Sequence, residues 1–419
     1  STRTTTTTTD YPMAMGTPRQ LTSFALCALL LGGISTSAFL SSSSAIIRSC
    51  RHSTSCSPSP PHFSRRSSSS TTLTMSSSTP TNNLVTIQQA IEAHKANDNN
   101  SQNNNKEDGS SKNIFIDGSW HMPVGPTPRN GRSEYTSAPR IPGAYYLDID
   151  DISPPPGSAA NPKKLPHMKP SPKRFACAMD QMGISPDDTL YVYATNGCGF
   201  YHRAYWTLSS CGYHDPKKVK LVQGSLDEWK ECGGELEFGE LNEDDARLFR
   251  MGDVDWESNS PKYTCWKDTE DSGDSVVDME QVFAVVKEEV SDAIIVDARS
   301  SGRFYGKEPE PRPGLRGGRM PGAVNVPFVS LLDSNDLTKF RPMEDVKDIF
   351  VKAGIAPLEE GSSSVPRKVI CSCGSGVTAA ALAVGLEECG LRKKEDISIY
   401  DGSWIDWGGD DDMPIVTTD

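Results

Sequence analysis

The residues best suited to chemistry lie between an apolar run and a helical pattern, in the stretch VICSCGSGVTAAALAV, residues 369–384. Cys373 sits in the middle of it, and Gly374, Ser375 and Gly376 follow. Both glycines permit positive φ, so main-chain N–H groups can turn inward, and the next helix adds the positive end of its dipole. These effects favour the ionised form of a thiol. We therefore predict that Cys373 is a nucleophile that can carry a persulfide.

The polar and sulfur-bearing residues near Cys373 are predicted to have supporting or structural roles. The hydroxyls of Ser375 and Thr378 can donate to sulfur or to a substrate oxyanion. Cys371 lies on the predicted strand and is interpreted as a buried structural residue. The chain has 11 cysteines without a CxxC pair. Because zinc sites need such spacing, we predict mostly reduced cysteines and no zinc site.

The elements that must position this loop form an alternating pattern. A strand is predicted over 368–371 and a helix over 377–388. Short apolar strands alternate with helical segments along the chain, which predicts α/β domains, each with a mostly parallel sheet flanked by helices. Sites in such sheets lie at the carboxyl ends of strands, where Cys373 falls.

The sequence repeats itself at a separation of about 180 residues, the size of a domain. RIPGAYYLDID (140–150) resembles RMPGAVNVPF (319–328), and KLVQGSLDEW (220–229) resembles SIYDGSWIDW (398–407). We predict an N-terminal domain over 83–238 that opens with a helix over 84–97, an acidic linker over 239–274, and a C-terminal catalytic domain over 275–419.

Residues 1–82 have the composition of a targeting presequence. A short apolar core within 15–40 precedes a basic, Ser-rich stretch that has no acidic residue, and Phe39 follows a small-residue exit. The core is too short to span a bilayer. Signal and transit characters in series predict import into a plastid, with the mitochondrion as the alternative. The net charge of −13 argues against nucleic acid as a partner.

Several of these motifs together resemble the 3-mercaptopyruvate sulfurtransferases of the two-domain rhodanese family. They are CGSGVTA (373–379), GRFYG (302–306), EPEPR (308–312), YDGSW (400–404) and, in the first half, IDGSW (116–120) and LDIDD (147–151). The resemblance runs from Leu84 to the end of the chain. It implies two tandem rhodanese-like domains, a monomer, no membrane association of the mature protein and no cofactor.

The resemblance also implies roles for individual residues. Cys373 is the sulfur acceptor, Ser375 assists proton movement, and Asp150 and His167 are catalytic residues near the domain interface. The alignment of His167 crosses a Pro-rich insertion, residues 154–169. The implied substrate-binding residues are Arg303 and Arg312, which hold the carboxylate and keto group, and the loop residues Gly374, Gly376, Val377 and Thr378.

The implied reaction moves sulfur from 3-mercaptopyruvate through a persulfide to thioredoxin, glutathione or cyanide and releases pyruvate. A thiosulfate sulfurtransferase stays open as an alternative, although such enzymes usually carry basic residues after the cysteine. A non-catalytic rhodanese-like protein is the second alternative and a rhodanese-related phosphatase the third, but the loop has no terminal arginine to hold phosphate.

Three further sets of residues are interpreted as structural. In CGFYHRA (198–204) Cys198 aligns with Cys373 and Arg203 with Thr378, but bulky side chains replace the second glycine. We expect a structural or interface role for Cys198 rather than a second active thiol. Asp297 is expected to orient an arginine or the backbone at a strand end. Two tryptophans of the C-terminal motif are expected in the core, Trp404 and Trp407.

Overall fold

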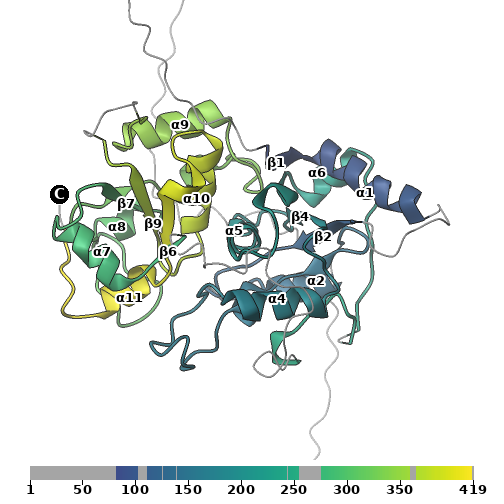
Figure 1. The fold of residues 1–419 in the computed structure, drawn as a ribbon, viewed down its shortest axis with the longest axis horizontal. Coiled ribbons are helices and arrows are strands. Elements are labelled where there is room, and N and C mark those ends of the chain that lie inside the picture. The colour runs from purple at the N-terminus through teal and green to yellow at the C-terminus, as the bar shows by residue number, and fades with distance from the viewer. Residues whose placement is uncertain are drawn as a thin grey trace, which may run out of the picture. The chain divides into compact units, whose positions relative to one another are not determined.

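The computed structural model describes residues 82–101, 111–124, 126–137, 139–242, 244–253, 275–358 and 365–417. These residues form two halves, each built on one parallel sheet (Figure 1). The predicted presequence lies outside the described residues, apart from Asn82. In the part of the chain that is described, no helix is both long enough and apolar enough to cross a membrane.

The first half contains five strands in the order β1-β5-β4-β2-β3, and every neighbouring pair is parallel. Its strands are β1 (Leu84–Thr86), β2 (Asn113–Asp117), β3 (Tyr145–Tyr146), β4 (Thr189–Tyr193) and β5 (Val219–Gln223). Its helices are α1 (Ile87–Ser101), α2 (Gly131–Ser137), α3 (Ile149–Ile152), α4 (Pro172–Gln181), α5 (His202–Ser210) and α6 (Leu226–Glu231). Two 3-10 turns join them, η2 (Pro216–Lys218) and η3 (Met251–Asp253).

The second half repeats this order as β6-β10-β9-β7-β8, again with parallel neighbours only. Its strands are β6 (Val276–Val277), β7 (Ala293–Asp297), β8 (Val324–Asn325), β9 (Lys368–Ser372) and β10 (Ile397–Tyr400). Its helices are α7 (Met279–Val286), α8 (Ser301–Phe304), α9 (Met343–Lys352), α10 (Ala379–Glu388) and α11 (Ser403–Gly409), with 3-10 turns η4 (Phe328–Leu331) and η5 (Lys394–Asp396). The predicted architecture, two α/β halves that each hold a parallel sheet flanked by helices, is confirmed.

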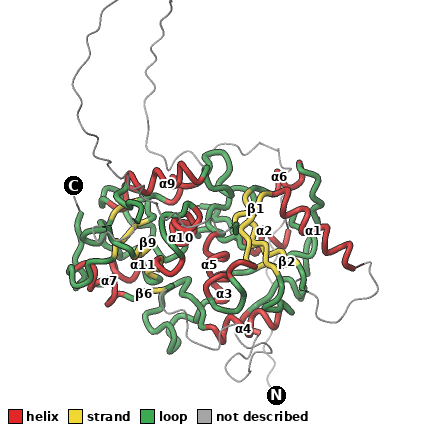
Figure 2. Tube along the Cα trace, turned by 45° about the horizontal axis from the view of Figure 1, so that its top comes forward, coloured by secondary structure: helices red, strands yellow, loops and turns green. Residues whose placement is uncertain are grey.

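Each sheet is covered on both faces, because successive side chains of a strand point to opposite faces and both sets are largely apolar. In the second half Ile370 packs with α7 and α11, whereas Val369 packs with α9 and α10. The core under α4 and α5 is continuous with the core under α9 and α10, since one hydrophobic cluster draws residues from both halves. Helices α5 and α10 are in contact there (Figures 1 and 2).

The opening of the first half differs from the prediction. Leu84–Thr86 is a strand, and the helix begins only at Ile87. Leu84 pairs with Leu221 at the edge of the sheet, so tertiary pairing overrides the helical pattern there. Residues 239–242 and 244–253, at the start of the predicted linker, lie on the first half: Leu241 N–H donates to the Thr136 carbonyl, and Phe249 is buried. The rest of that stretch, 254–274, lies outside the described residues, so the domain boundaries stay a prediction.

Candidate active site

The predicted nucleophile lies where β9 ends at the carboxyl edge of the sheet. Cys373 directly follows Ser372, is 2% exposed and precedes α10 by one short loop. The N–H of Gly376 donates to its sulfur at 3.1 Å, so one inward main-chain amide faces the thiol as the sequence predicts. This amide and the N-terminal end of α10 both favour negative charge on the sulfur.

The two loop glycines have different roles. Gly376 has φ +82°, which side-chain-bearing residues rarely adopt. Gly374 does not have a positive φ, so that part of the prediction is wrong. A Cβ on Gly374 would instead lie 3.0 Å from Nη2 of Arg303. Gly376 is therefore required by the backbone turn, and Gly374 by the close approach of a guanidinium.

The C-terminal DGSW motif holds the loop from the neighbouring strand end. Cys373 N–H donates to Oγ of Ser403 at 3.1 Å, and Ser403 Oγ–H donates to the Tyr400 carbonyl. The N–H groups of Trp404 and Ile405 donate to the carbonyls of Cys373 and Gly374, each at 3.0 Å. In the sequence this motif indicated only the family resemblance, and its hydrogen bonds to the loop were not predicted. The repetition of the motif after β5 and β10 was the available signal.

Arg303 is held by a buried carboxylate that the sequence did not predict. The side chain of Glu310 is 1% exposed, and its Oε2 accepts hydrogen bonds from Nε and Nη2 of Arg303. Its Oε1 accepts from Arg299 at 2.8 Å. Arg299 in turn donates to Asp297 and lies over the Trp404 ring, its Cζ 4.0 Å from the centroid. As predicted, Asp297 orients an arginine at a strand end.

Arg312 is the uncommitted cation of the site. Within the described residues it makes no hydrogen bond or ion pair. Burial lowers the pKa of its guanidinium; the negative charge of Cys373 opposes this shift, and the positive charge of Arg303 reinforces it. Asp150 and Glu310 also favour the charged form. A desolvated guanidinium among these groups can receive the carboxylate of a small anion in a bidentate geometry.

The predicted Asp and His meet each other beside this cation. Nδ1 of His167 hydrogen-bonds to Oδ1 of Asp150, and Nε1 of Trp120 donates to Oδ2 at 2.9 Å. Burial acts to raise the pKa of Asp150, but the His167 contact and the Trp120 donation outweigh it and leave the pKa below its ordinary value. His167 is buried with φ +59°, and its Nε2 has no hydrogen-bond partner. That nitrogen is free to exchange a proton with a bound molecule.

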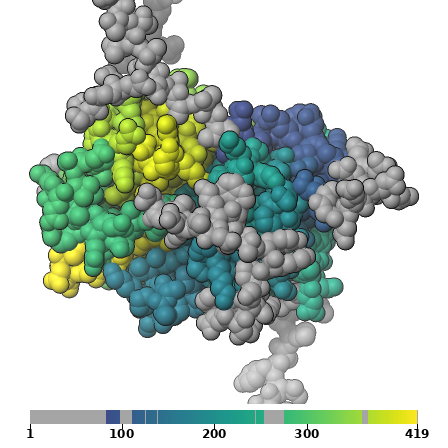
Figure 3. Space-filling model, viewed as in Figure 1, coloured from purple at the N-terminus to yellow at the C-terminus, as the bar shows by residue number. Residues whose placement is uncertain are grey.

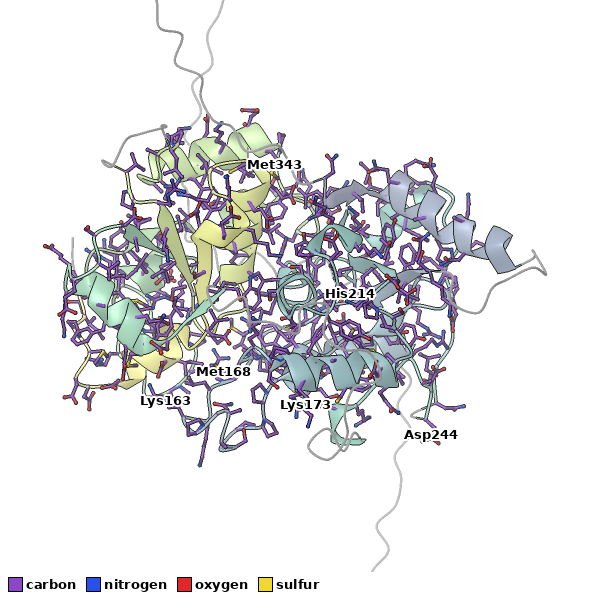
Figure 4. The ribbon with its side chains drawn as sticks, viewed as in Figure 1. Lys163, Met168, Lys173, His214, Asp244 and Met343 are labelled. Atoms are coloured by element: carbon purple, nitrogen blue, oxygen red, sulfur yellow. The ribbon has the colours of Figure 1, made fainter. Side chains whose placement is uncertain are left out.

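The Pro-rich insertion that carries His167 is fastened to the second half. Lys163 and Met168 lie on it (Figure 4), and the ammonium of Lys163 pairs with Asp406 at 2.8 Å. Lys169 N–H donates to Oδ2 of Asp401, and its ammonium to Ser275 at 2.9 Å. Figure 3 shows the blue surface before α4 against the green and yellow surface of the second half. The contacts place His167 at the junction between the halves.

The other predicted loop residues lie as expected from their positions. Ser375 and Val377 are buried, and Thr378 is partly buried at the N-cap of α10. Ser375 makes no hydrogen bond with another described residue, so its hydroxyl is available. Among the described residues, no three His, Cys, Asp or Glu side chains are grouped as metal ligands would be.

The remaining cysteines of interest are buried and inert. Cys371 is fully buried on β9, and burial raises its pKa. Cys198 is also fully buried and donates from Sγ to the Trp120 carbonyl at 3.3 Å. Burial raises the pKa of Cys198 to about 11, which opposes a second active thiol. Trp404 and Trp407 are core residues, as predicted.

Comparisons with known proteins agree with this geometry. The rhodanese-like domain model matches residues 284–410. A probable 3-mercaptopyruvate sulfurtransferase from Schizosaccharomyces pombe is 31% identical over 315 residues, 74% of this chain and 92% of that protein. The mitochondrial thiosulfate/3-mercaptopyruvate sulfurtransferase 1 of Arabidopsis thaliana is 31% identical, with 73% and 74% covered.

A solved structure extends the likeness to three dimensions. The crystal structure of SseA from Escherichia coli matches with a TM-score of 0.54 at 26% identity, covering 77% of this chain and 98% of that one. Sequence identity, coverage and fold therefore indicate the same kind of protein as the Cys373 loop at the end of β9 does. The chain belongs to the 3-mercaptopyruvate/thiosulfate sulfurtransferase enzymes of the two-domain rhodanese family.

Proposed function

We propose that this sulfurtransferase takes sulfur from 3-mercaptopyruvate onto Cys373 and passes it to a thiol or to cyanide. The observation that carries the proposal is the pairing of an amide-stabilised sulfur, 3.1 Å from the Gly376 nitrogen, with the uncommitted guanidinium of Arg312. The donor is a small anion with a carboxylate beside a ketone. Arg312 and Arg303 together offer the two cationic surfaces that such a molecule needs.

The first half-reaction forms one bond and breaks one. The thiolate of Cys373 attacks the substrate sulfur, a sulfur–sulfur bond forms, and the carbon–sulfur bond breaks with its electron pair going to carbon. The product is the enolate of pyruvate, whose oxyanion the arginines stabilise. A proton then reaches the enolate carbon, and we assign its delivery to Ser375 with the Asp150–His167 pair. The persulfide left on Cys373 keeps the hydrogen of the substrate thiol.

The second half-reaction restores the enzyme. The thiolate of an acceptor, such as glutathione or thioredoxin, attacks the outer sulfur, and Cys373 leaves as thiolate. Cyanide reacts in the same way and leaves as thiocyanate. Neither step needs a metal or an organic cofactor. We expect the protein to act as a monomer.

The decisive experiment compares sulfur donors on the same enzyme. Pyruvate release from 3-mercaptopyruvate and thiocyanate formation from thiosulfate are each measured with cyanide as the common acceptor. A higher kcat/KM with 3-mercaptopyruvate is expected because the loop offers amides and hydroxyls rather than cationic side chains to a doubly charged donor. A preference for thiosulfate would reverse the donor assignment, and Cys373→Ser controls for turnover elsewhere.

For the compartment we propose import into a plastid, with the mitochondrion as the alternative. The presequence composition of residues 1–82 supports organelle import. The name of the Arabidopsis relative places that protein in mitochondria, which supports the alternative. A fluorescent fusion of residues 1–82, imaged in cells that contain both organelles, distinguishes them.

A further inference from the structure

One arginine of the first half is buried against the catalytic loop of the second. Arg203, on α5, is 1% exposed. Its Nη1 donates to the Gly376 carbonyl at 3.1 Å and lies 2.7 Å from Oδ1 of Asp401. Its Nη2 donates to the carbonyl of His167. A single guanidinium thus joins the sulfur loop, the end of β10 and the residue paired with Asp150.

The first half shows what this arrangement replaces. There, the hydroxyl of Tyr201 donates to the Thr338 carbonyl at 2.8 Å, across to the second half. Two residues after Thr338, the N–H of Phe340 donates to the side chain of Gln223, at the end of β5. The second half has the matching bond at the end of β10: the N–H of Lys169, two residues after His167, donates to the side chain of Asp401.

The symmetric partner of Tyr201 is a glycine. With Cys198 aligned on Cys373, Tyr201 aligns on Gly376, which has no side chain to reach His167. Arg203 occupies that space, because a Cβ on Gly376 would lie 2.9 Å from its Nη1. The first half therefore supplies to the catalytic loop a contact that the loop cannot make for itself.

We propose that Arg203 is a positioning residue for sulfur transfer, which holds the Cys373 loop and His167 in one geometry. Gly376 donates its N–H to the Cys373 sulfur and accepts from Arg203 with its own carbonyl, so the guanidinium restrains the residue that faces the thiol. Without it, the Gly376 and His167 carbonyls lose the donor that they share. The turnover test of this positioning role rests on the proposed function, whereas the test on the Cys373 thiol itself does not.

The test uses two variants that separate position from charge. Arg203→Met leaves Asp401 as a buried unpaired charge, so it is combined with Asp401→Asn, which removes that charge while both carbonyls still lose their donor. Arg203→Lys keeps a cation beside Asp401 with a single ammonium in place of the planar fork. Tyr201→Phe is the matched control, since it removes a buried hydrogen bond between the halves that does not touch the Cys373 loop.

The thiol readout is the rate of Cys373 alkylation by iodoacetamide against pH, followed by mass spectrometry, and the turnover readout is kcat and KM with 3-mercaptopyruvate. We expect the double variant and Arg203→Lys to shift the alkylation midpoint upward and lower kcat by about 100-fold, as small misplacements of reacting groups do. Tyr201→Phe should leave both unchanged.

Wild-type alkylation and kcat in the double variant would overturn the proposal, as would an equal loss in Tyr201→Phe. If 3-mercaptopyruvate proves not to be the donor, the alkylation profile still decides the role of Arg203. If wild-type enzyme turns over 3-mercaptopyruvate but the Arg203 variants show unshifted alkylation, the positioning role is rejected and the proposed function is kept.

Discussion

Replacing Gly376 by alanine tests the geometry on which the site depends. The residue has φ +82°, and the left-handed region costs a side-chain-bearing residue roughly 1–2 kcal/mol. The new Cβ would lie 2.9 Å from Nη1 of Arg203 and 3.0 Å from the carbonyl oxygen of Asp401. Such overpacking of a buried site costs about 1–3 kcal/mol. The two contributions together predict a loss of about 2–5 kcal/mol in the free energy of unfolding.

Gly374→Ala is the matched control, two residues away. Its φ is not in the left-handed region, and its Cβ would contact one group, Nη2 of Arg303 at 3.0 Å. The end of a side chain can move, and alanine also reduces the conformational entropy of the unfolded chain by about 0.4–1 kcal/mol. We therefore expect little change in stability but a higher KM, because displaced Arg303 is an expected substrate contact.

Urea unfolding followed by tryptophan fluorescence measures the stability difference, and the burst of pyruvate in a single turnover measures formation of the persulfide. Gly376→Ala should unfold at lower urea and lose most of the burst, since its N–H no longer faces the Cys373 sulfur. Equal unfolding midpoints for the two variants, or a wild-type burst in Gly376→Ala, would refute this account of the loop.

Three further predictions concern residues around this loop and in the first half. Glu310→Gln leaves Arg303 without its buried carboxylate, while Arg299 keeps that of Asp297; we expect about 3–5 kcal/mol lower stability and a raised KM for 3-mercaptopyruvate, and an unchanged KM would contradict the role given to Arg303. Burial raises the pKa of Asp117 from 3.8 to about 7, so between these pH values the native carboxyl holds a proton that the unfolded one has lost. The free energy of unfolding that this proton contributes is fully present below pH 3.8 and is lost as the pH rises through about 7. Asp117→Asn should therefore stabilise the protein by up to about 4 kcal/mol at pH 8 and by much less near pH 4. Burial lowers the pKa of His202 and His214 to about 4, which makes stability rise with pH, and comparing the variant with wild type at each pH cancels that effect. A gap independent of pH would contradict the assignment. Cys198→Ala should retain persulfide loading, measured by intact mass as one added sulfur, whereas Cys373→Ser should lose it; loss of loading in Cys198→Ala would give that buried thiol a role the structure does not.

The positions of the nucleophile and of the fold were predictable because they follow from local patterns. An apolar strand, a glycine-containing turn and a helix are sequence signals, and their order places Cys373 at the carboxyl edge of the sheet. The duplication was visible as repeated motifs, and the two sheets have the same strand order. The edge strands escaped prediction because β6 has two residues and β1 three, too few to show a period of two.

The support around the site was less predictable, because it depends on contacts between distant segments. Glu310 in EPEPR carried no sign that it would sit between Arg299 and Arg303. Gly374 and Gly376 looked equivalent in sequence, yet only the second needs positive φ. The first is small because Arg303 approaches it, and that approach is set by Glu310, which folds back from a loop after α8.

The two halves divide the work through the same loop position. In the first, Cys198 faces the Trp120 carbonyl, and bulky side chains fill the contact with the second half: the Phe200 ring lies tilted beside that of Phe328, with ring centroids 5.5 Å apart. In the second, Gly376 leaves that space open and Arg203 enters it from the other side. Gly376 presents its N–H to the Cys373 sulfur and, having no side chain, leaves the adjoining space at the junction to Arg203. Cys373 therefore depends on a residue of the first half for the packing around its loop.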